Sequence, residues 1–256
     1  MAMGLRPLER SQWLELDEHR EEELRYKADL LRDNFDVVVA TTPGAERASA
    51  EVLREVTSAL RTYHPHVDVS SAESEHPLVA SARLVQEDLC IMEKTDSWRL
   101  TAAVVCFPSR WSLATKIGTT LDAIHGPVPL YGEKLSSPTN AFFDRMTPEK
   151  AVWRLNWTLI DNPDLHQPVS ARKSPEGDLA KWFFRVERQT LRQLPETGCV
   201  LFTIRNYVTN AASLVASDPE FGSSLLRSLE TAPPEVQDYK GWVGVAEKLR
   251  TGLSSE

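Results

Sequence analysis

The stretch Arg110–Pro129 reads RWSLATKIGTTLDAIHGPVP and separates two regions of different pattern. Its apolar residues recur at helical spacing: Leu113, Ile117, Leu121 and Ile124. This spacing predicts a helix over 111–125 with one apolar face. His125 ends the segment, and Gly126–Pro129 stops regular structure directly after it. A rigid break at that point would fix the direction of the imidazole.

Three interpretations of His125 are open. Imidazole ligates iron, zinc or copper, and it also transfers protons near neutral pH. A histidine at a helix C-terminus is also a common structural feature, because the helix dipole favours imidazolium there. Cys106 is an alternative ligand, since thiolate binds haem iron in some monooxygenases. The other interpretation of Cys106 is a small apolar residue at a strand end.

The regions on both sides of this stretch predict an α+β fold. Before it, residues 11–62 are predicted to be helical apart from a break at 41–44, and a loop at 64–77 and a hairpin of strands 82–92 and 98–106 follow. After it we expect a short helix within 130–150, strands at 152–160, 182–191 and 199–208, and helices over 217–250 that break at 232–234. This order is typical of a mainly antiparallel sheet covered by helices.

Composition excludes several classes of protein. The chain has 256 residues and a formal net charge of −8, which argues against a general nucleic-acid binder. The eleven glycines form neither dinucleotide-binding nor P-loop motifs. The apolar runs are too short to span a bilayer, and the N-terminus lacks a signal-peptide core. With three widely spaced cysteines, we expect a cytoplasmic protein without a membrane partner.

Polar residues gather on the three predicted strands that follow His125. On 182–191, Arg185, Glu187 and Gln189 share one face by strand alternation. They are expected to line a polar pocket with side chains of the neighbouring strands, namely Arg154, Asn156, Thr203 and Arg205. Arginine suits a carboxylate or propionate there, and Glu187 suits an amine. Surface ion pairing is the alternative.

Several strings, in order, resemble the haem-dependent oxidative N-demethylase family. They are LVQEDLC (84–90), CFPSRW (106–111), KIG (116–118), IHGPVP (124–129), RLNW (154–157), RQTL (188–191) and LFTIR (201–205). The resemblance runs from Leu5–Leu8 to about Val208, which is most of the chain.

The resemblance implies a PAS-like, haem-binding fold. In haem PAS sensors the iron ligand lies on the helix before the last three strands, and His125 occupies that place. We therefore expect one domain over 1–256: an N-terminal helical layer (1–77), a haem-binding core (78–210) and a C-terminal helical extension (211–256).

The resemblance also suggests roles for other residues. Arg154 corresponds to an arginine that meets oxygen or a propionate, with Arg185 and Arg205 as alternatives. Lys116 and Arg110, which lie in matching strings, are further cofactor-binding candidates. Glu187, with Asn156 beside it on the sheet, is the candidate for positioning a cationic amine; this last assignment rests on strand facing and charge.

The activity implied by the resemblance is O2-dependent N-demethylation of a small amine by haem b. In the family, dimethylamine is oxidised with release of formaldehyde, and NADPH supplies electrons through partner subunits that carry FMN and an iron–sulfur centre. This chain has no cysteine framework for such a cluster, so we expect a separate reductase. A haem sensor or carrier without turnover is one alternative, and a haem enzyme acting on a different nitrogen compound is another.

Overall fold

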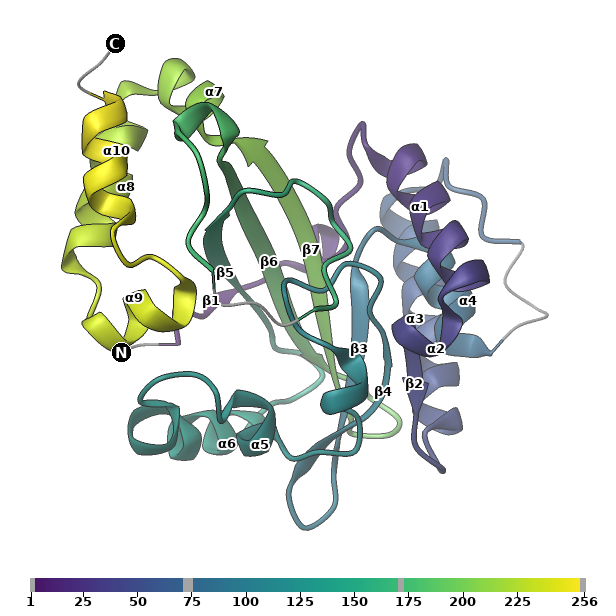
Figure 1. Cartoon of the computed structure of the whole chain (residues 1–256). Helices are drawn as coiled ribbons and strands as arrows, with labels where there is room; N and C mark the ends of the chain where they lie inside the picture. Colours follow the sequence, from purple (N-terminus) through teal and green to yellow (C-terminus); the bar gives the residue numbers. More distant parts are fainter. Residues whose placement is uncertain (1–2, 71–75, 170–172, 254–256) are drawn as a thin grey trace.

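The computed structural model describes residues 3–70, 76–169 and 173–253 and shows the expected α+β class. Residues 71–75 of the predicted loop 64–77 lie outside this description. A seven-stranded sheet runs through the centre of the molecule in the order β1-β5-β6-β7-β3-β4-β2 (Figure 1). Every strand pair in it is antiparallel.

Four of the five long strands match the predicted positions closely, and β3 begins later than predicted. The five are β3 (Asp88–Lys94), β4 (Trp98–Val104), β5 (Ala151–Ile160), β6 (Phe183–Gln193) and β7 (Val200–Asn210). The edges are two short strands that the sequence pattern did not indicate, β1 (Arg6–Pro7) and β2 (Val39–Thr41). The last strand, β7, pairs with both β6 and β3, which joins the final three strands to the first hairpin.

Helices surround the sheet in three groups. The N-terminal group is α1 (Arg20–Asp33), α2 (Phe35–Val38), α3 (Glu46–Tyr63) and α4 (Pro77–Leu84). The middle group is α5 (Leu121–His125) and α6 (Ser136–Asp144). The C-terminal group is α7 (Ala211–Ser217), α8 (Pro219–Thr231), α9 (Pro234–Lys240) and α10 (Val245–Leu253).

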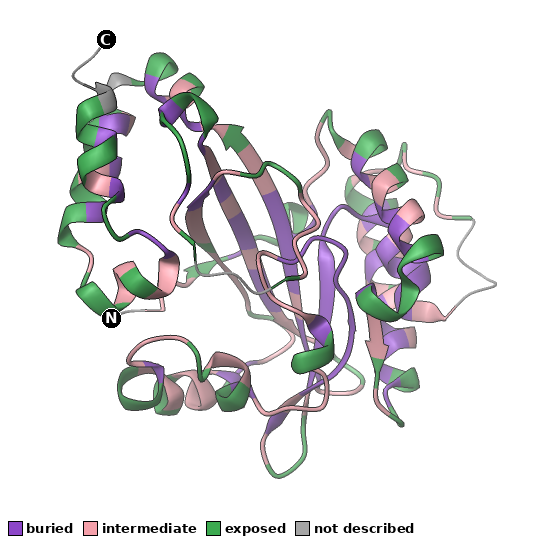
Figure 2. Ribbon diagram, viewed as in Figure 1, coloured by how far each residue is buried: buried purple, intermediate pink, exposed green. Residues whose placement is uncertain are grey.

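The N-terminal helices cover one face of the sheet. Val52, Val56 and Leu60 of α3 are fully buried and cluster with Leu89 of β3 and Leu201 of β7. These apolar positions recur every four residues, which gives α3 one continuous apolar face. Buried residues follow the strands and the inner sides of these helices, and exposed residues follow their outer sides (Figure 2).

The opposite face of the sheet meets the stretch around His125. Cys90 and Val200 on the strands cluster with Leu113, Leu121 and Phe143. A third cluster fixes the C-terminal helices on the ends of β5 and β6, where Trp157 stacks on Trp242 with 4.5 Å between ring centroids. The C-terminal and N-terminal helices lie on opposite sides of the view in Figure 1.

The predicted helix over 111–125 is wrong in extent. Leu113–Thr115 forms a single 3-10 turn, and only Leu121–His125 is α-helical. Gly118 has a φ of +72°, and its N–H donates to the carbonyl of Leu100 (2.7 Å), so the chain turns back onto β4. The apolar residues that suggested a helix still share one cluster.

The predicted strand 82–92 begins too early. Residues 77–84 form α4 instead, because Pro77 stands at its first turn and the His76 imidazole accepts from the N–H of Leu78 (3.3 Å). The helix expected within 130–150 is present as α6, preceded by one π-helical turn, Tyr131–Leu135. Phe143 of α6 is buried, and Phe142 is partly buried.

A carboxylate from α3 holds the turn between β6 and β7. Glu51, which is 1% exposed, accepts from the N–H of Glu196 (2.6 Å) and of Thr197 (3.0 Å). The backbone closes the same turn, since Leu194 donates to the carbonyl of Cys199 (2.8 Å). The register of this hairpin is therefore fixed at its closed end.

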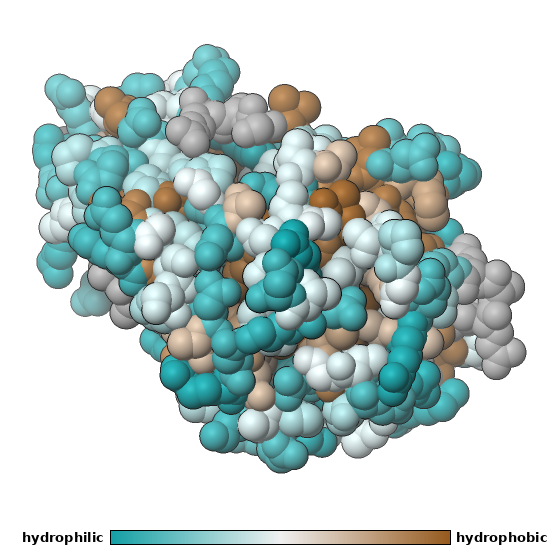
Figure 3. Space-filling view, turned by 90° about the horizontal axis from the view of Figure 1, so that it is seen from below, coloured by the Kyte–Doolittle hydropathy of each residue, from teal (hydrophilic) through white to brown (hydrophobic). Residues whose placement is uncertain are grey.

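The outer surface is mixed in character. Seen from below, hydrophilic side chains cover most of the molecule, and apolar residues gather in small areas between them (Figure 3). Across the described residues we find no helix with the length and apolar character that spanning a bilayer requires.

Candidate functional site

His125 ends α5, and among the described residues only one of its ring nitrogens has a hydrogen-bond partner. Its Nδ1 lies 2.9 Å from the carbonyl oxygen of Leu121. A carbonyl oxygen only accepts hydrogen bonds, so Nδ1 carries the hydrogen and Nε2 keeps its lone pair. This is the arrangement found at metal-ligating histidines, where a hydrogen bond from the second nitrogen fixes the tautomer.

The surroundings of His125 keep the ring uncharged and oriented. Burial lowers the pKa of His125 below its ordinary value, and the nearby cations Arg154 and Lys116 lower it further. The imidazole is therefore neutral at pH 7, as a ligand must be. Tyr131, 4% exposed, stacks on it with 4.8 Å between ring centroids and 14° between the planes.

Glu187 lies on the face of the sheet that meets this region, as predicted with Asn156 and Gln189. Asn156 pairs with Glu187 across β5 and β6, and directly paired residues point to the same face. The Asn156 Nδ2 and Gln189 Nε2 amides both donate to Glu187 Oε2, at 3.1 and 2.8 Å. Among the described residues Glu187 Oε1 has no hydrogen-bond partner.

Arg154 shares that face, opposite Gln189. Its buried Nε has no hydrogen-bond partner in the described part of the chain. Burial lowers the pKa of Arg154, and Glu187 is the one acidic side chain nearby that offsets the effect. The two are nevertheless not paired, since no ion pair within 4.0 Å joins them in the described structure. Arg154 is therefore a cation with open hydrogen-bonding capacity.

Lys240, at the end of α9, reaches the same cluster and was not predicted. Its Nζ donates to Asn156 Oδ1 (2.8 Å) and to the carbonyl of Trp157 (3.0 Å). Burial lowers the pKa of Lys240, and Glu187 acts in the opposite direction. The network Lys240–Asn156–Glu187–Gln189 thus joins the C-terminal helices to the sheet.

Two predicted cofactor-binding arginines are occupied by structural contacts. Arg185 is 1% exposed, and its guanidinium donates to the carbonyls of Phe107 (2.8 Å), Leu165 (3.1 Å) and Asp164 (3.2 Å). Arg110 forms an ion pair with Asp161 at 3.2 Å. Both arginines thus hold the loop after β5, Arg110 by an ion pair and Arg185 by hydrogen bonds to backbone carbonyls.

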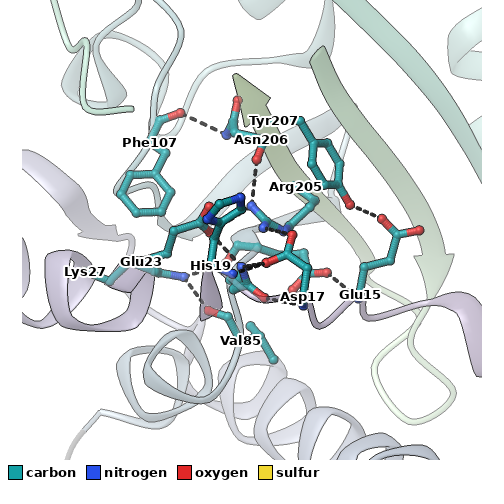
Figure 4. A network of polar contacts seen from close by, with 12 residues as sticks. Glu15, Asp17, His19, Glu23, Lys27, Val85, Phe107, Arg205, Asn206 and Tyr207 are labelled. Atoms are coloured by element: carbon teal, nitrogen blue, oxygen red, sulfur yellow. Dashed lines mark hydrogen bonds and ion pairs between the residues drawn. The ribbon is translucent and has the colours of Figure 1, made fainter. Parts of the chain in front are cut away.

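Arg205 was expected in the same pocket as Arg154, and this expectation is wrong. It pairs with Arg188 on β6, so it points to the face covered by the N-terminal helices, as does Thr203. There it forms ion pairs with Asp17 (2.6 Å) and Glu23 (2.8 Å), as Figure 4 shows. Strand alternation correctly predicts that Thr203 and Arg205 share one face of β7. It does not predict that this face is opposite to the one on which Arg154 lies.

Cys106 is unsuited to be a thiolate ligand. It is fully buried in the cluster under the N-terminal helices. Burial raises the pKa of its thiol to about 12, so it is protonated at neutral pH. The small apolar role fits it better.

The residues around His125 fit a haem group. Haem needs one neutral imidazole with a free nitrogen, which His125 supplies, and cations for its propionates. Lys116 donates one hydrogen bond, to the carbonyl of Ile124 (2.8 Å), and its ammonium has two further donor positions. In the described part of the chain no group of three or more His, Cys, Asp or Glu side chains is arranged to hold a metal ion.

The chain matches the model of a known protein family. The model of the family described as haem-dependent oxidative N-demethylase, alpha subunit-like, matches residues 4–68 and 66–250. These two overlapping segments span nearly the whole chain. The chain belongs to this family. The match confirms the family resemblance derived from the strings around His125, and its description associates the family with haem and with oxidative chemistry.

Sequence reasoning missed two residues of this region, Tyr131 and Lys240. Tyr131 lies six residues beyond His125 in a turn that periodicity does not describe. Lys240 is 84 residues from Asn156, and no local pattern connects them.

Proposed function

We propose that this chain is the haem-binding component of an O2-dependent oxidative N-demethylase that acts on a small amine. The observation that carries the proposal is the neutral His125 imidazole with Nδ1 bonded to the Leu121 carbonyl and Nε2 open. The family match supports it. Three antiparallel strands follow His125, which supports a PAS-type core within a single domain.

His125 would hold the iron of haem b, and Lys116 would hold a propionate. Bound haem would supply the activation of O2 and the oxidation of the N-methyl carbon. Electrons would come from NADPH through a separate reductase with FMN and an iron–sulfur centre. The buried thiols are all free, which agrees with a reducing cytoplasm.

The polar face of β5 and β6 would bind the amine. Glu187 Oε1 is open to accept an amine N–H, and the two amides on Oε2 fix the carboxylate in direction. Arg154 supplies open N–H donors beside it. Such donors, already oriented and partly removed from water, stabilise developing negative charge. Oxidation at the methyl carbon gives a carbinolamine, which breaks down to the demethylated amine and formaldehyde.

The proposal is tested by expressing the protein with a supply of haem and recording visible spectra as Fe(III), Fe(II) and Fe(II)–CO. We expect a haem spectrum that His125→Ala abolishes, because the variant removes the iron ligand. His66→Ala, in an exposed loop, is the matched control and should retain haem.

An unchanged Soret band in His125→Ala would disprove the ligand assignment. Haem binding without formaldehyde release from any methylamine would favour a sensor or carrier instead. Formaldehyde is measured with a chemical reductant in place of the reductase.

A further inference from the structure

The charges on the polar face of β5 and β6 do not balance. Arg154 and Lys240 are both attracted to Glu187, and it is the one carboxylate that acts on either of them. Glu187 also attracts Arg185, but Asp88 and Asp164 act on Arg185 as well. Arg154 and Lys240 have Glu187 alone, so these two cations depend on one anion in a partly buried region. Unbalanced charge of this kind is costly away from water, so a ligand that corrects it is favoured.

The open hydrogen-bonding positions show where such a ligand would bind. Glu187 Oε1 is an acceptor without a partner among the described residues. Arg154 has a buried Nε that lacks a partner, and no hydrogen bond of its other nitrogens is found in the described structure. Arg154 lies on β5 two residues before Asn156, and Asn156 pairs with Glu187 on β6. The Arg154 and Glu187 side chains therefore lie on the same face of the sheet. One acceptor and one cationic donor thus face the same space.

We propose that the substrate of this site is an N-methylated amino acid, whose ammonium binds Glu187 and whose carboxylate binds Arg154. This inference rests on the function proposed above and names its substrate class. A simple alkylammonium ion would add a third cation beside one carboxylate. A zwitterion adds no net charge, and it supplies the anion that Arg154 lacks.

The reaction balances for N-methylglycine as the example. N-methylglycine, O2, two electrons and two protons give glycine, formaldehyde and water. The C–H bond of the methyl group is oxidised, and the C–N bond then breaks with the electron pair on nitrogen. One oxygen atom enters formaldehyde and the other is reduced to water by electrons from the reductase.

The test compares four ligands on the haem-loaded protein by calorimetry and by difference spectra: N-methylglycine, N-methylglycinamide, dimethylamine and acetate. We expect N-methylglycine to bind about tenfold or more tightly than the other three, because it alone carries both charges. Arg154→Ala should reduce its preference over the amide to about one, and Arg154→Lys should restore part of it. Arg145→Ala, which removes an exposed arginine after α6, is the control and should leave the preference unchanged.

Three results would overturn the inference. One is equal affinity for N-methylglycine and dimethylamine. Another is a preference that survives in Arg154→Ala. The third is loss of haem from Arg154→Ala, which would assign Arg154 to a propionate. These three results would leave the proposed function standing, whereas absence of haem from the wild-type protein would overturn the proposed function itself.

Discussion

Burial changes the chemistry of single side chains in this protein more than their type suggests. Asp88, at the start of β3, is fully buried and accepts from the N–H groups of Cys106 (2.8 Å) and Phe107 (3.0 Å). It therefore fixes the end of β4, from which the chain leaves toward His125. Burial raises the pKa of Asp88 to about 6, and Lys27 and Arg185 partly offset this.

The raised pKa of Asp88 predicts a pH dependence of stability. The folded state binds this proton more tightly than the unfolded state, so the contribution of Asp88 to stability falls as pH rises through the interval between its ordinary value and about 6. Between about pH 4.5 and about pH 7 the loss should be roughly 2 kcal/mol. Urea unfolding of wild type and Asp88→Asn at both pH values measures it. Equal pH slopes in the two proteins would contradict this.

At the scale of elements, α5 is too short to be stable alone. It has five residues, and isolated helices of this length do not form in water. Its N-cap is Thr120, whose Oγ1 accepts from the N–H of Ala123 (3.1 Å). The turn at Gly118, where φ is positive, and the apolar contacts of Leu121 position the other residues of α5. The direction of His125 therefore depends on this cap and this turn.

Removing the cap should loosen His125. We expect Thr120→Ala to lower the free energy of unfolding by about 1 kcal/mol, because one donor of the first turn loses its partner. Haem affinity should fall with it, since Leu121 and His125 lie on the same short helix. Thr120→Ser keeps the hydroxyl and serves as the control. Chemical unfolding and haem titration together give both values, and unaltered haem affinity in Thr120→Ala would show that the turn alone holds the helix.

At the scale of the whole molecule, the C-terminal helices contribute a side chain to the polar cluster on β5 and β6. Lys240 ends α9 inside the polar cluster, and Gly241, with a φ of +68°, turns the chain so that Trp242 meets Trp157. A Cβ at Gly241 would lie 2.5 Å from the carbonyl oxygen of Lys173. Gly241 is thus closely packed, and its backbone also adopts the left-handed conformation.

Loss of the Trp242 side chain should weaken amine binding at Glu187. Trp242→Ala removes a buried indole, and we expect a loss of about 3–5 kcal/mol in the free energy of unfolding. Because Lys240 is two residues away, amine binding should weaken even at temperatures where the variant is folded. Trp242→Phe retains a stacking ring and is the control. Thermal unfolding and amine titration test this, and normal amine affinity in the folded Trp242→Ala protein would contradict the coupling.

Much of the sheet could be predicted from the sequence, because strand alternation is local. Alternation predicts that Arg185, Glu187 and Gln189 share one face of β6. It also predicts that Arg154 and Asn156 share one face of β5. The phase of β7 relative to β5 is not local, which is why Arg205 was misplaced. The helix expected over 111–125 failed at Gly118, where backbone bonds to β4 replace helical ones. Lys240 depends on packing across the whole chain.

Glu51 accepts two hydrogen bonds from the turn between β6 and β7, and this limits where β6 can accommodate an inserted residue. Along β6, Glu187 and Arg188 are neighbours that point to opposite faces. If one residue were inserted in β6 between Arg188 and the turn while the turn stayed fixed, Glu187 and Arg188 would exchange faces. The sign of the charge presented toward His125 is thus decided by whether the strand contains an odd or an even number of residues between the turn and Glu187.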